Sequence, residues 1–182
     1  PKVEPFGAGF ARVFQVEIGD LAYDSRKAGP GTLFFCVVGE RRDGHDFAAR
    51  VVAAGATALV VERRLDVAVP QVVVPSARAA MAPFASAFAG DPTAALKVVG
   101  VTGTNGKTTT AYLVREILEA AGIQTGLMGT VKQVVGGVEE PVERTTPEAI
   151  DLQETFRRMI DGGDRAVAME VSSHAMVLHR AD

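Results

Sequence analysis

Short apolar runs alternate with segments of helical periodicity along most of this chain. The runs are continuous, have the length of strands and are bounded by glycine, proline or polar residues, which predicts buried strands. They lie at residues 33–38, 58–61, 72–74, 98–102, 125–131 and 166–171. Residues 6–20 alternate more weakly and predict one or two short strands. A strand or hairpin is predicted at residues 134–135, before the turn formers Gly136 and Gly137.

Four segments between these runs have apolar residues at helical spacing and predict helices. They are residues 47–54, 76–88, 107–121 and 147–161. Ser76 and Thr146 are residue types that favour the N-cap, and Pro147 suits the first helical position. Pro83 lies inside the second helix and predicts a kink there.

Strands that alternate with helices predict an α/β fold in which a mainly parallel sheet carries helices on its faces. A length of 182 residues suits one large domain or two small ones. Clustered turn formers predict a linker at residues 89–93. We therefore expect a first domain at residues 1–93 and a second at residues 94–182.

Composition and charge exclude several classes of protein. Hydrophobic residues make up 47% of the chain, enough for a packed core, so intrinsic disorder is excluded. The net charge of −3 argues against a nucleic-acid partner recognised through bulk electrostatics. All of the acidic excess lies in residues 94–182. A phosphate bound there must therefore be held locally, by backbone amides, a lysine and a metal ion.

The cysteine content and the N-terminus bear on location. Cys36 is the single cysteine and stands in an apolar run, which predicts a buried thiol and a reducing compartment. The N-terminus lacks the apolar core of a signal peptide, and the apolar runs are too short to span a bilayer. We therefore expect a cytoplasmic protein. Because the chain lacks an initiator methionine and ends at Asp182 without a closing element, we also expect a fragment.

A phosphate-binding loop is the strongest chemical motif. A predicted strand at 98–102 leads into a glycine-rich turn at 103–106 and a predicted helix that starts at Lys107. Glycines let backbone N–H groups approach an anion, and the helix adds the positive end of its dipole. Lys107 would reach the terminal phosphates of a nucleotide, and the Thr108 hydroxyl would bind Mg²⁺. The strict P-loop pattern is Gly, four residues, then Gly-Lys-Ser/Thr. It requires a glycine two residues before Gly103, where this chain has a valine. An ordinary strand-to-helix turn is the alternative.

Glu170 stands near the end of the last predicted strand, one strand–helix unit after the loop. A carboxylate there is placed to hold Mg²⁺, directly or through water. A strand-end glutamate satisfied by a loop amide is the alternative. Ser172 and His174 are near neighbours in sequence, whereas a catalytic Ser–His pair forms by spatial approach. Hydrolase chemistry is therefore not indicated.

Two further sets of residues could bind anions. Thr145 and Thr146 precede a helix, where hydroxyls and free amides suit a phosphate or carboxylate, although plain capping explains them equally well. The loops that contain Ser25 and the pair Arg41 and Arg42 flank one buried strand. Arginines there could pair with a diphosphate, although each loop could equally be a solvated turn.

Taken together, these stretches resemble the Mur ligases, the ATP-dependent amide-forming enzymes of peptidoglycan synthesis. The loop at 103–108 is similar to the family's ATP motif, including its departure from the strict pattern. The other matching stretches are Asp24-Ser25-Arg26 with 31–35, Gly39 with Asp43-Gly44, Thr145-Thr146-Pro147 with Leu152-Gln153, and 169–174 with His179-Arg180. The last two resemble most closely the ligases that add the third residue of the stem peptide. The first two are shared with the ligases that add the D-Ala-D-Ala dipeptide.

The resemblance implies a role for each motif. Tyr23 and Ser25 would contact the uridine nucleotide of the substrate, and Arg41 and Arg42 would lie beside its diphosphate. The muramyl-peptide end would be held by Arg144, Thr145, Thr146, Ser172 and Arg180. The ATP phosphates would be bound by Gly103, Thr104, Asn105, Gly106, Lys107, Thr108 and Thr109. Lys107 and Glu170 would be the catalytic residues, and Thr108 and Glu170 would bind Mg²⁺.

In this family ATP phosphorylates a carboxylate of UDP-N-acetylmuramoyl-L-Ala-D-Glu, and the amine of diaminopimelate or lysine then displaces the phosphate. Such a reaction depends on positioning and charge neutralisation, without a protein nucleophile. The resemblance implies that residues 1–93 form the UDP-substrate domain and residues 94–182 the first part of the ATPase domain. Its carbamylated lysine and amino-acid site would lie beyond Asp182. We expect ATP and Mg²⁺ as cofactors, small-molecule partners, a monomer, and no complete amide synthesis by this chain alone.

Three alternatives remain open from the sequence. The chain could belong to a dipeptide-adding Mur ligase. It could be a P-loop kinase or switch without affinity for a UDP-sugar. A folate-polyglutamate-type ligase would share the ATP loop, but the stretch Asp24-Ser25-Arg26 argues against it.

Overall fold

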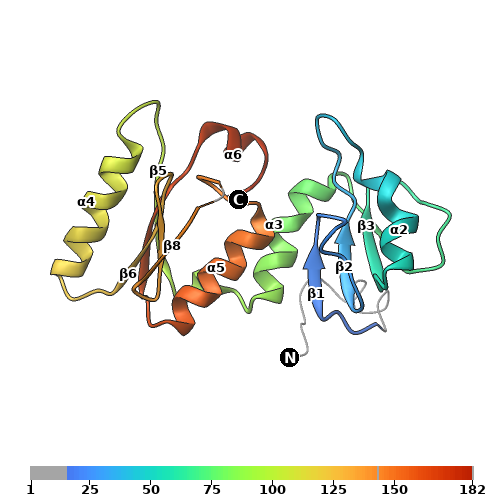
Figure 1. Cartoon of the computed structure of the whole chain (residues 1–182), viewed down its shortest axis with the longest axis horizontal. Helices are drawn as coiled ribbons and strands as arrows, with labels where there is room; N and C mark the ends of the chain where they lie inside the picture. The colour runs from blue at the N-terminus through green and yellow to red at the C-terminus, as the bar shows by residue number, and fades with distance from the viewer. Residues whose placement is uncertain (1–15, 143, 182) are drawn as a thin grey trace. The chain divides into compact units, whose positions relative to one another are not determined.

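The computed structural model describes residues 16–142 and 144–181. Contacts between Cα atoms divide the chain into two compact units, Pro1–Met81 and Ala82–Asp182. Each unit has a β-sheet of its own, drawn in Figure 1. The α/β fold class is confirmed. The units divide within the helix α3 (Ala77–Phe88), whereas the boundary after Thr93 is a division by function and stays a prediction.

The first unit contains a four-stranded parallel sheet in the order β1-β2-β3-β4. Its strands are β1 (Asp20–Ala22), β2 (Thr32–Phe35), β3 (Ala58–Val61) and β4 (Gln71–Val73). The strands β2 and β3 are buried along their whole length, as expected for a parallel sheet. The 3₁₀ turn η1 (Gly44–Phe47) and the helix α2 (Ala48–Ala53) connect β2 to β3.

The core of the first unit lies between the sheet and α2. Phe34, Leu59 and Val61 of the sheet pack in one cluster with Ala48 and Val51 of α2. Cys36 belongs to the same cluster and is fully buried, so the predicted buried thiol is confirmed. Desolvation raises the pKa of this thiol to about 12, so it is protonated at neutral pH and is not a nucleophile.

The second unit contains a five-stranded mixed sheet in the order β5-β9-β6-β7-β8. Its strands are β5 (Lys97–Val101), β6 (Thr125–Met128), β7 (Gln133–Val135), β8 (Val138–Glu140) and β9 (Ala166–Glu170). The strand β9 lies between β5 and β6 and is parallel to both, while β6, β7 and β8 pair antiparallel. The parallel part carries the strand–helix alternation seen in the sequence, and the predicted turn at Gly136 and Gly137 joins β7 to β8.

Helices cover both faces of the second sheet, as Figure 1 shows for α4 (Lys107–Ala120) and α5 (Ala149–Asp161). Successive residues of β9 point to opposite faces, so Val167 and Met169 join one cluster and Ala168 another. The first cluster includes Phe156 of α5, and the second includes Ala111 of α4. The carboxyl ends of β5, β9 and β6 therefore meet at one edge of a sheet that is fixed on both faces.

Several predicted element bounds were wrong. The strand predicted at 33–38 ends at Phe35, and the weak strands predicted at 6–20 lie mostly outside the described residues. The last long helix begins at Ala149, and its N-cap is Glu148. Thr146 is not the cap, because its hydroxyl donates a tertiary hydrogen bond to the Glu170 carbonyl at 3.0 Å. Pro83 does lie inside α3, as predicted.

Two short elements complete the second unit. They are η2 (Pro92–Ala94), which leads into β5, and α6 (Ser173–Val177), which follows β9. Across the described ranges, every helix is too short or too polar to cross a bilayer.

A close backbone contact generates a first prediction. A Cβ atom on Gly44 would lie 2.5 Å from the Val37 nitrogen and 2.7 Å from its carbonyl oxygen, so the backbone would have to shift. We expect Gly44→Ala to reduce the free energy of unfolding by about 1 to 3 kcal/mol, measured by urea denaturation. A Cβ on Gly29 would meet nothing within 4 Å, so Gly29→Ala is the matched control. Equal stability of the two variants would contradict this account.

Candidate functional site

The glycine-rich loop lies between β5 and α4, as the sequence predicted. Gly103 and Gly106 have φ of 142° and 78°, values that favour glycine, and Gly106 is the N-cap of α4. Residues 102–106 are exposed. Lys107 folds back over the loop, and its Nζ donates to the Gly103 carbonyl at 2.8 Å. The lysine charge is thereby held at the loop, where a nucleotide phosphate would need it.

The register of the sheet places Glu170 beside the phosphate loop. Val101, the last residue of β5, is the direct neighbour of Glu170, the last residue of β9. On the other side of β9, β6 ends one position away, with Met128 beside Met169. Ligands of parallel sheets gather at such strand ends. This edge therefore brings the loop, Glu170 and the residues after β6 together.

The Glu170 side chain is almost fully buried, with 1% of its surface exposed, and both carboxylate oxygens have a partner. Oε1 accepts the backbone N–H of Thr130 at 2.8 Å, and Oε2 accepts the Thr130 hydroxyl at 3.1 Å. Because that hydroxyl donates its proton to Glu170, the Thr145 hydroxyl at 3.3 Å must donate to Thr130. A chain of hydrogen bonds thus runs from Thr145 to the buried carboxylate.

Thr146 connects the same strand end to α6. Its hydroxyl donates to the Glu170 carbonyl and accepts the backbone N–H of Ser172 at 3.3 Å. The Ser172 hydroxyl accepts the N–H of Ala175 at 3.1 Å and so caps α6. Thr145, Thr146 and Ser172 are therefore brought together around Glu170, as the prediction of a shared site requires.

Arg144 and Arg180 meet on one buried glutamate. Glu148 Oε1 lies 2.9 Å from an Arg180 nitrogen and 3.2 Å from an Arg144 nitrogen, while the glutamate is 4% exposed. Arg180 also donates to the Thr146 carbonyl at 3.4 Å. Two cations on one anion leave a net positive charge next to Thr146, which suits a carboxylate ligand.

The predicted uridine and diphosphate residues lie in the first unit. Tyr23 and Ser25 follow β1, and Arg41 and Arg42 lie on the connection that follows β2. Since β1 and β2 are adjacent and parallel, these loops share one sheet edge. Next to Ser25, a hydrogen bond from the Arg26 side chain, helped by its backbone N–H, lowers the pKa of Asp24 to about 2. Arg41 and Arg42 are exposed.

Asp43 anchors the loop that bears the two arginines. Burial alone would raise the pKa of this carboxyl, but hydrogen bonds from the backbone and ring of His45 and from Arg63 lower it to about 2. The distances to Asp43 are 2.5 Å for His45 Nδ1 and 2.8 Å for Arg63 Nη2. Asp43 is therefore a carboxylate at neutral pH.

The residues at the strand ends fit a magnesium ion bound mainly through phosphates and water. Among the described residues, no group of three or more His, Cys, Asp and Glu side chains is arranged around a common point. Mg²⁺ commonly takes one or two protein oxygens together with waters and substrate phosphates. Glu170 and Thr108 provide a carboxylate and a hydroxyl of this kind, and each Glu170 oxygen has lone pairs left beyond its hydrogen bond.

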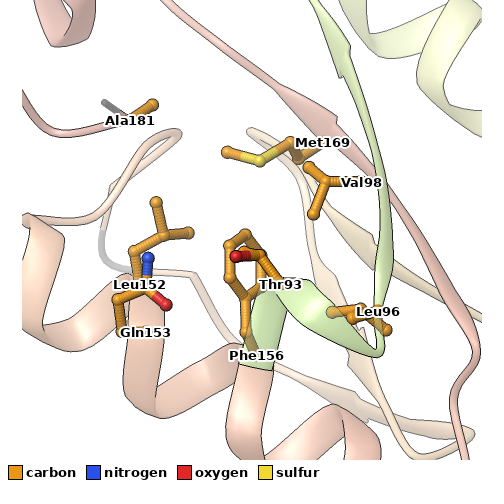
Figure 2. A pocket seen from close by; sticks show the side chains of 8 residues that line it. All are labelled: Thr93, Leu96, Val98, Leu152, Gln153, Phe156, Met169 and Ala181. Atoms are coloured by element: carbon orange, nitrogen blue, oxygen red, sulfur yellow. The ribbon is translucent and has the colours of Figure 1, made fainter. Parts of the chain in front are cut away.

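An apolar cavity of about 220 Å³ lies in the second unit, and its lining includes Met169 and Ala181, the chain neighbours of Glu170 and Arg180. In Figure 2, Leu152, Gln153 and Phe156 of α5 face Met169 of β9 and Val98 of β5 across it. Within the described ranges, the buried Gln153 Oε1 has no hydrogen-bond partner. None of the predicted site residues lines this cavity.

Two family models match the chain in sequence order. The model described as "Mur ligase family, catalytic domain" matches residues 17–89, and the model described as "Mur ligase middle domain" matches residues 101–182. This chain belongs to the Mur ligase family. The resemblance drawn from the phosphate loop and the strand-end motifs is thereby confirmed.

Curated relatives of this Mur ligase chain are named UDP-N-acetylmuramoyl-L-alanyl-D-glutamate–2,6-diaminopimelate ligase. The protein from Listeria monocytogenes serotype 4b is 50% identical over 91% of the chain, and the protein from Geobacillus thermodenitrificans is 52% identical over 88%. The chain spans about a third of the length of these relatives, 34% and 33% respectively.

Solved structures of Mur ligases are similar to the chain as well. A structure titled as the same diaminopimelate ligase matches with a TM-score of 0.73 and 26% identity, over 90% of this chain and 34% of its own. MurF from Acinetobacter baumannii matches with a TM-score of 0.63 and 27% identity, over 91% of this chain and 33% of its own.

Sequence reasoning missed two polar residues of this Mur ligase chain that the structure places at the strand edge. Thr130 holds both oxygens of Glu170, and Glu148 holds two arginines. Thr130 was missed because the strand predicted at 125–131 contains it, whereas β6 ends at Met128. Glu148 gave no comparable signal, since a glutamate near a helix start is usually solvated.

The role of Thr130 can be tested with a shape-conserving change. Thr130→Val removes the hydroxyl that donates to Glu170, so we expect the free energy of unfolding to fall by about 1 to 2 kcal/mol. Thr130→Ser keeps the hydroxyl and should remain close to the unmodified chain. Urea denaturation of the three proteins measures both effects. If valine and serine have the same effect, the hydroxyl does not support Glu170.

The lowered pKa of Asp43 predicts a pH-dependent contribution to stability. A carboxyl whose pKa falls from 3.8 to about 2 on folding stabilises the folded state above pH 4, and this contribution is lost as the pH falls toward 2. We expect Asp43→Asn to reduce the free energy of unfolding by about 1 to 2 kcal/mol at pH 7, with the difference shrinking below pH 4.

Denaturant titrations between pH 7 and pH 3 provide the measurement. Asp66→Asn, the same change at an exposed aspartate, is the matched control and should have little effect at any pH. A difference between Asp43→Asn and the unmodified chain that does not vary with pH would contradict the assignment.

Proposed function

We propose that this chain carries the substrate-binding and part of the ATP-binding machinery of an ATP-dependent ligase in peptidoglycan synthesis. The ligase would join diaminopimelate to UDP-N-acetylmuramoyl-L-Ala-D-Glu through an acyl phosphate. The names of the curated relatives, at 50% and 52% identity, favour diaminopimelate over lysine. Residues 1–93 would bind the UDP end of the substrate, and residues 94–182 would bind ATP and the peptide end.

One observation carries this proposal. The strand that ends at Glu170 lies in register with the strand of the phosphate loop, and it is hydrogen-bonded to Thr130 and Thr146. The ATP loop and the hydroxyls proposed to hold the substrate carboxylate are thus built on one sheet edge. Phosphoryl transfer to a carboxylate requires these two groups to be close, because its catalysis depends on positioning and charge neutralisation.

Different residues would bind the ATP phosphates and the carboxylates of the peptide. The backbone amides at 103–106, together with Lys107, Thr108 and Thr109, would hold the ATP phosphates. Arg180 and Arg144, assembled on Glu148, would hold the carboxylates of the peptide beside Thr145, Thr146 and Ser172.

Mg²⁺ would be held by Thr108 and Glu170, and when bound it would neutralise charge on the transferring phosphate. Tyr23 and Ser25 would contact the uridine, with Arg41 and Arg42 at the diphosphate. We expect the protein to act in the cytoplasm as a monomer on small molecules, without a nucleic-acid or membrane partner.

Titration calorimetry with two ligands tests this proposal. The folded chain should bind UDP-N-acetylmuramoyl-L-Ala-D-Glu and, separately, ATP with Mg²⁺. Lys107→Ala should weaken ATP binding by about 100-fold, the scale of removing one charged partner from a desolvated contact, and should leave the UDP ligand unaffected. Lys97→Ala, at an exposed lysine of β5, is the matched control. ATP binding without any heat from the UDP ligand would favour a P-loop switch instead.

A further inference from the structure

Arg41 and Arg42 lie on a tight turn, residues 39–42, which we call the arginine turn. The Gly39 N–H donates to the Arg42 carbonyl at 2.9 Å, and Val38 and Asp43 form a β-bridge at the base of the turn. The Gly44 N–H donates to the Val37 carbonyl at 2.9 Å. The backbone of the turn is therefore closed, while its arginine side chains are exposed.

A buried imidazole ties the base of the arginine turn to the end of β3. The His45 ring has no exposed surface, and its Nδ1 lies 2.5 Å from Asp43 Oδ1. Its Nε2 accepts the backbone N–H of Glu62 at 2.9 Å. Because that amide can only donate, Nε2 must carry the lone pair, so the ring proton is on Nδ1 and is donated to Asp43.

Glu62, which donates its N–H to His45, and the next residue, Arg63, each make a further hydrogen bond. The Glu62 carboxylate accepts the N–H of Ala77, the first residue of α3, at 2.9 Å. Arg63, the next residue, donates to the second oxygen of Asp43 at 2.8 Å. The base of the turn is thus bonded to two consecutive residues that follow β3.

We propose that His45 is a positioning residue that holds the arginine turn ready for the diphosphate of the substrate. This inference rests on the proposed function, which assigns the diphosphate to Arg41 and Arg42. His45 is buried and would act through Asp43 and the turn backbone. Long arginine side chains lose conformational entropy on binding, and a turn that is already ordered lowers this cost. His45 therefore contributes to affinity for the diphosphate and leaves the ATP loop unaffected.

Two substitutions separate the two bonds of the ring. His45→Asn places an amide at the position of Nδ1, so it can still donate to Asp43 but cannot reach the Glu62 N–H. His45→Gln places a carbonyl oxygen at the position of Nε2, so it can still accept from Glu62. We expect His45→Asn to weaken binding of UDP-N-acetylmuramoyl-L-Ala-D-Glu by about tenfold, because it breaks the bond to the end of β3. We expect His45→Gln to weaken it by less than about threefold, because the backbone N–H of residue 45 still holds Asp43 at 2.9 Å.

A double-mutant cycle distinguishes positioning from a general loss of stability. In an Arg41→Ala/Arg42→Ala background the turn has no guanidinium groups left to position, so adding His45→Asn should cause no further loss of affinity. Calorimetry gives the affinity of each protein for the UDP ligand, and the affinity for ATP with Mg²⁺ should stay unchanged in all of them. Arg63→Gln removes the ion pair with Asp43 at a half-exposed side chain, and it should weaken binding of the UDP ligand by about threefold.

The outcomes separate the two proposals. An equal loss from His45→Asn with and without the arginines overturns the positioning role, as does unchanged affinity in both His45→Asn and Arg63→Gln. If the unmodified chain binds ATP but shows no heat with the UDP ligand, the proposed function fails and this inference fails with it.

Discussion

The buried carboxylate of Glu170 is the interaction on which the second unit's candidate site depends. A carboxylate with 1% exposure is stable only when both oxygens are hydrogen-bonded, and Thr130 provides both bonds from the end of the neighbouring strand. The carbonyl of the same residue accepts from Thr146, so two segments distant in sequence are bonded to one residue. The proposed metal ligand and the proposed substrate hydroxyls thus support one another, and a change at any of them should affect the others.

In the first unit a buried histidine fixes the turn that bears the two exposed arginines. The base of this turn is bonded through Asp43 and the buried ring of His45 to the residues after β3. In the second unit the buried carboxylate of Glu148 holds Arg144 and Arg180 in a comparable way. The net acidity of residues 94–182 is compatible with phosphate binding, because the backbone amides at 103–106 and Lys107 act at short range.

Sequence patterns predicted the strands and helices well where tertiary contacts agree with local preference, and failed where they compete. Thr146 has the residue type of an N-cap, yet its hydroxyl bonds to the Glu170 carbonyl, and the helix begins later with Glu148 at its cap. Thr130 was missed because the strand predicted at 125–131 contains it, whereas β6 ends at Met128, and because the sequence does not show which strand lies beside β9. Strand order comes from the packing of the whole sheet.

The α/β class, the glycine-rich loop before Lys107 and the membership of the Mur ligase family could be predicted from the sequence alone, because these depend on local spacing. Glycines at the turn, a lysine at the helix start and apolar runs of strand length are all read along the chain. Three contacts can be seen only in the folded chain: Val101 lies beside Glu170, Glu148 joins two arginines, and His45 accepts the Glu62 N–H. These contacts join residues that strand order brings together, and neither propensity nor periodicity specifies that order.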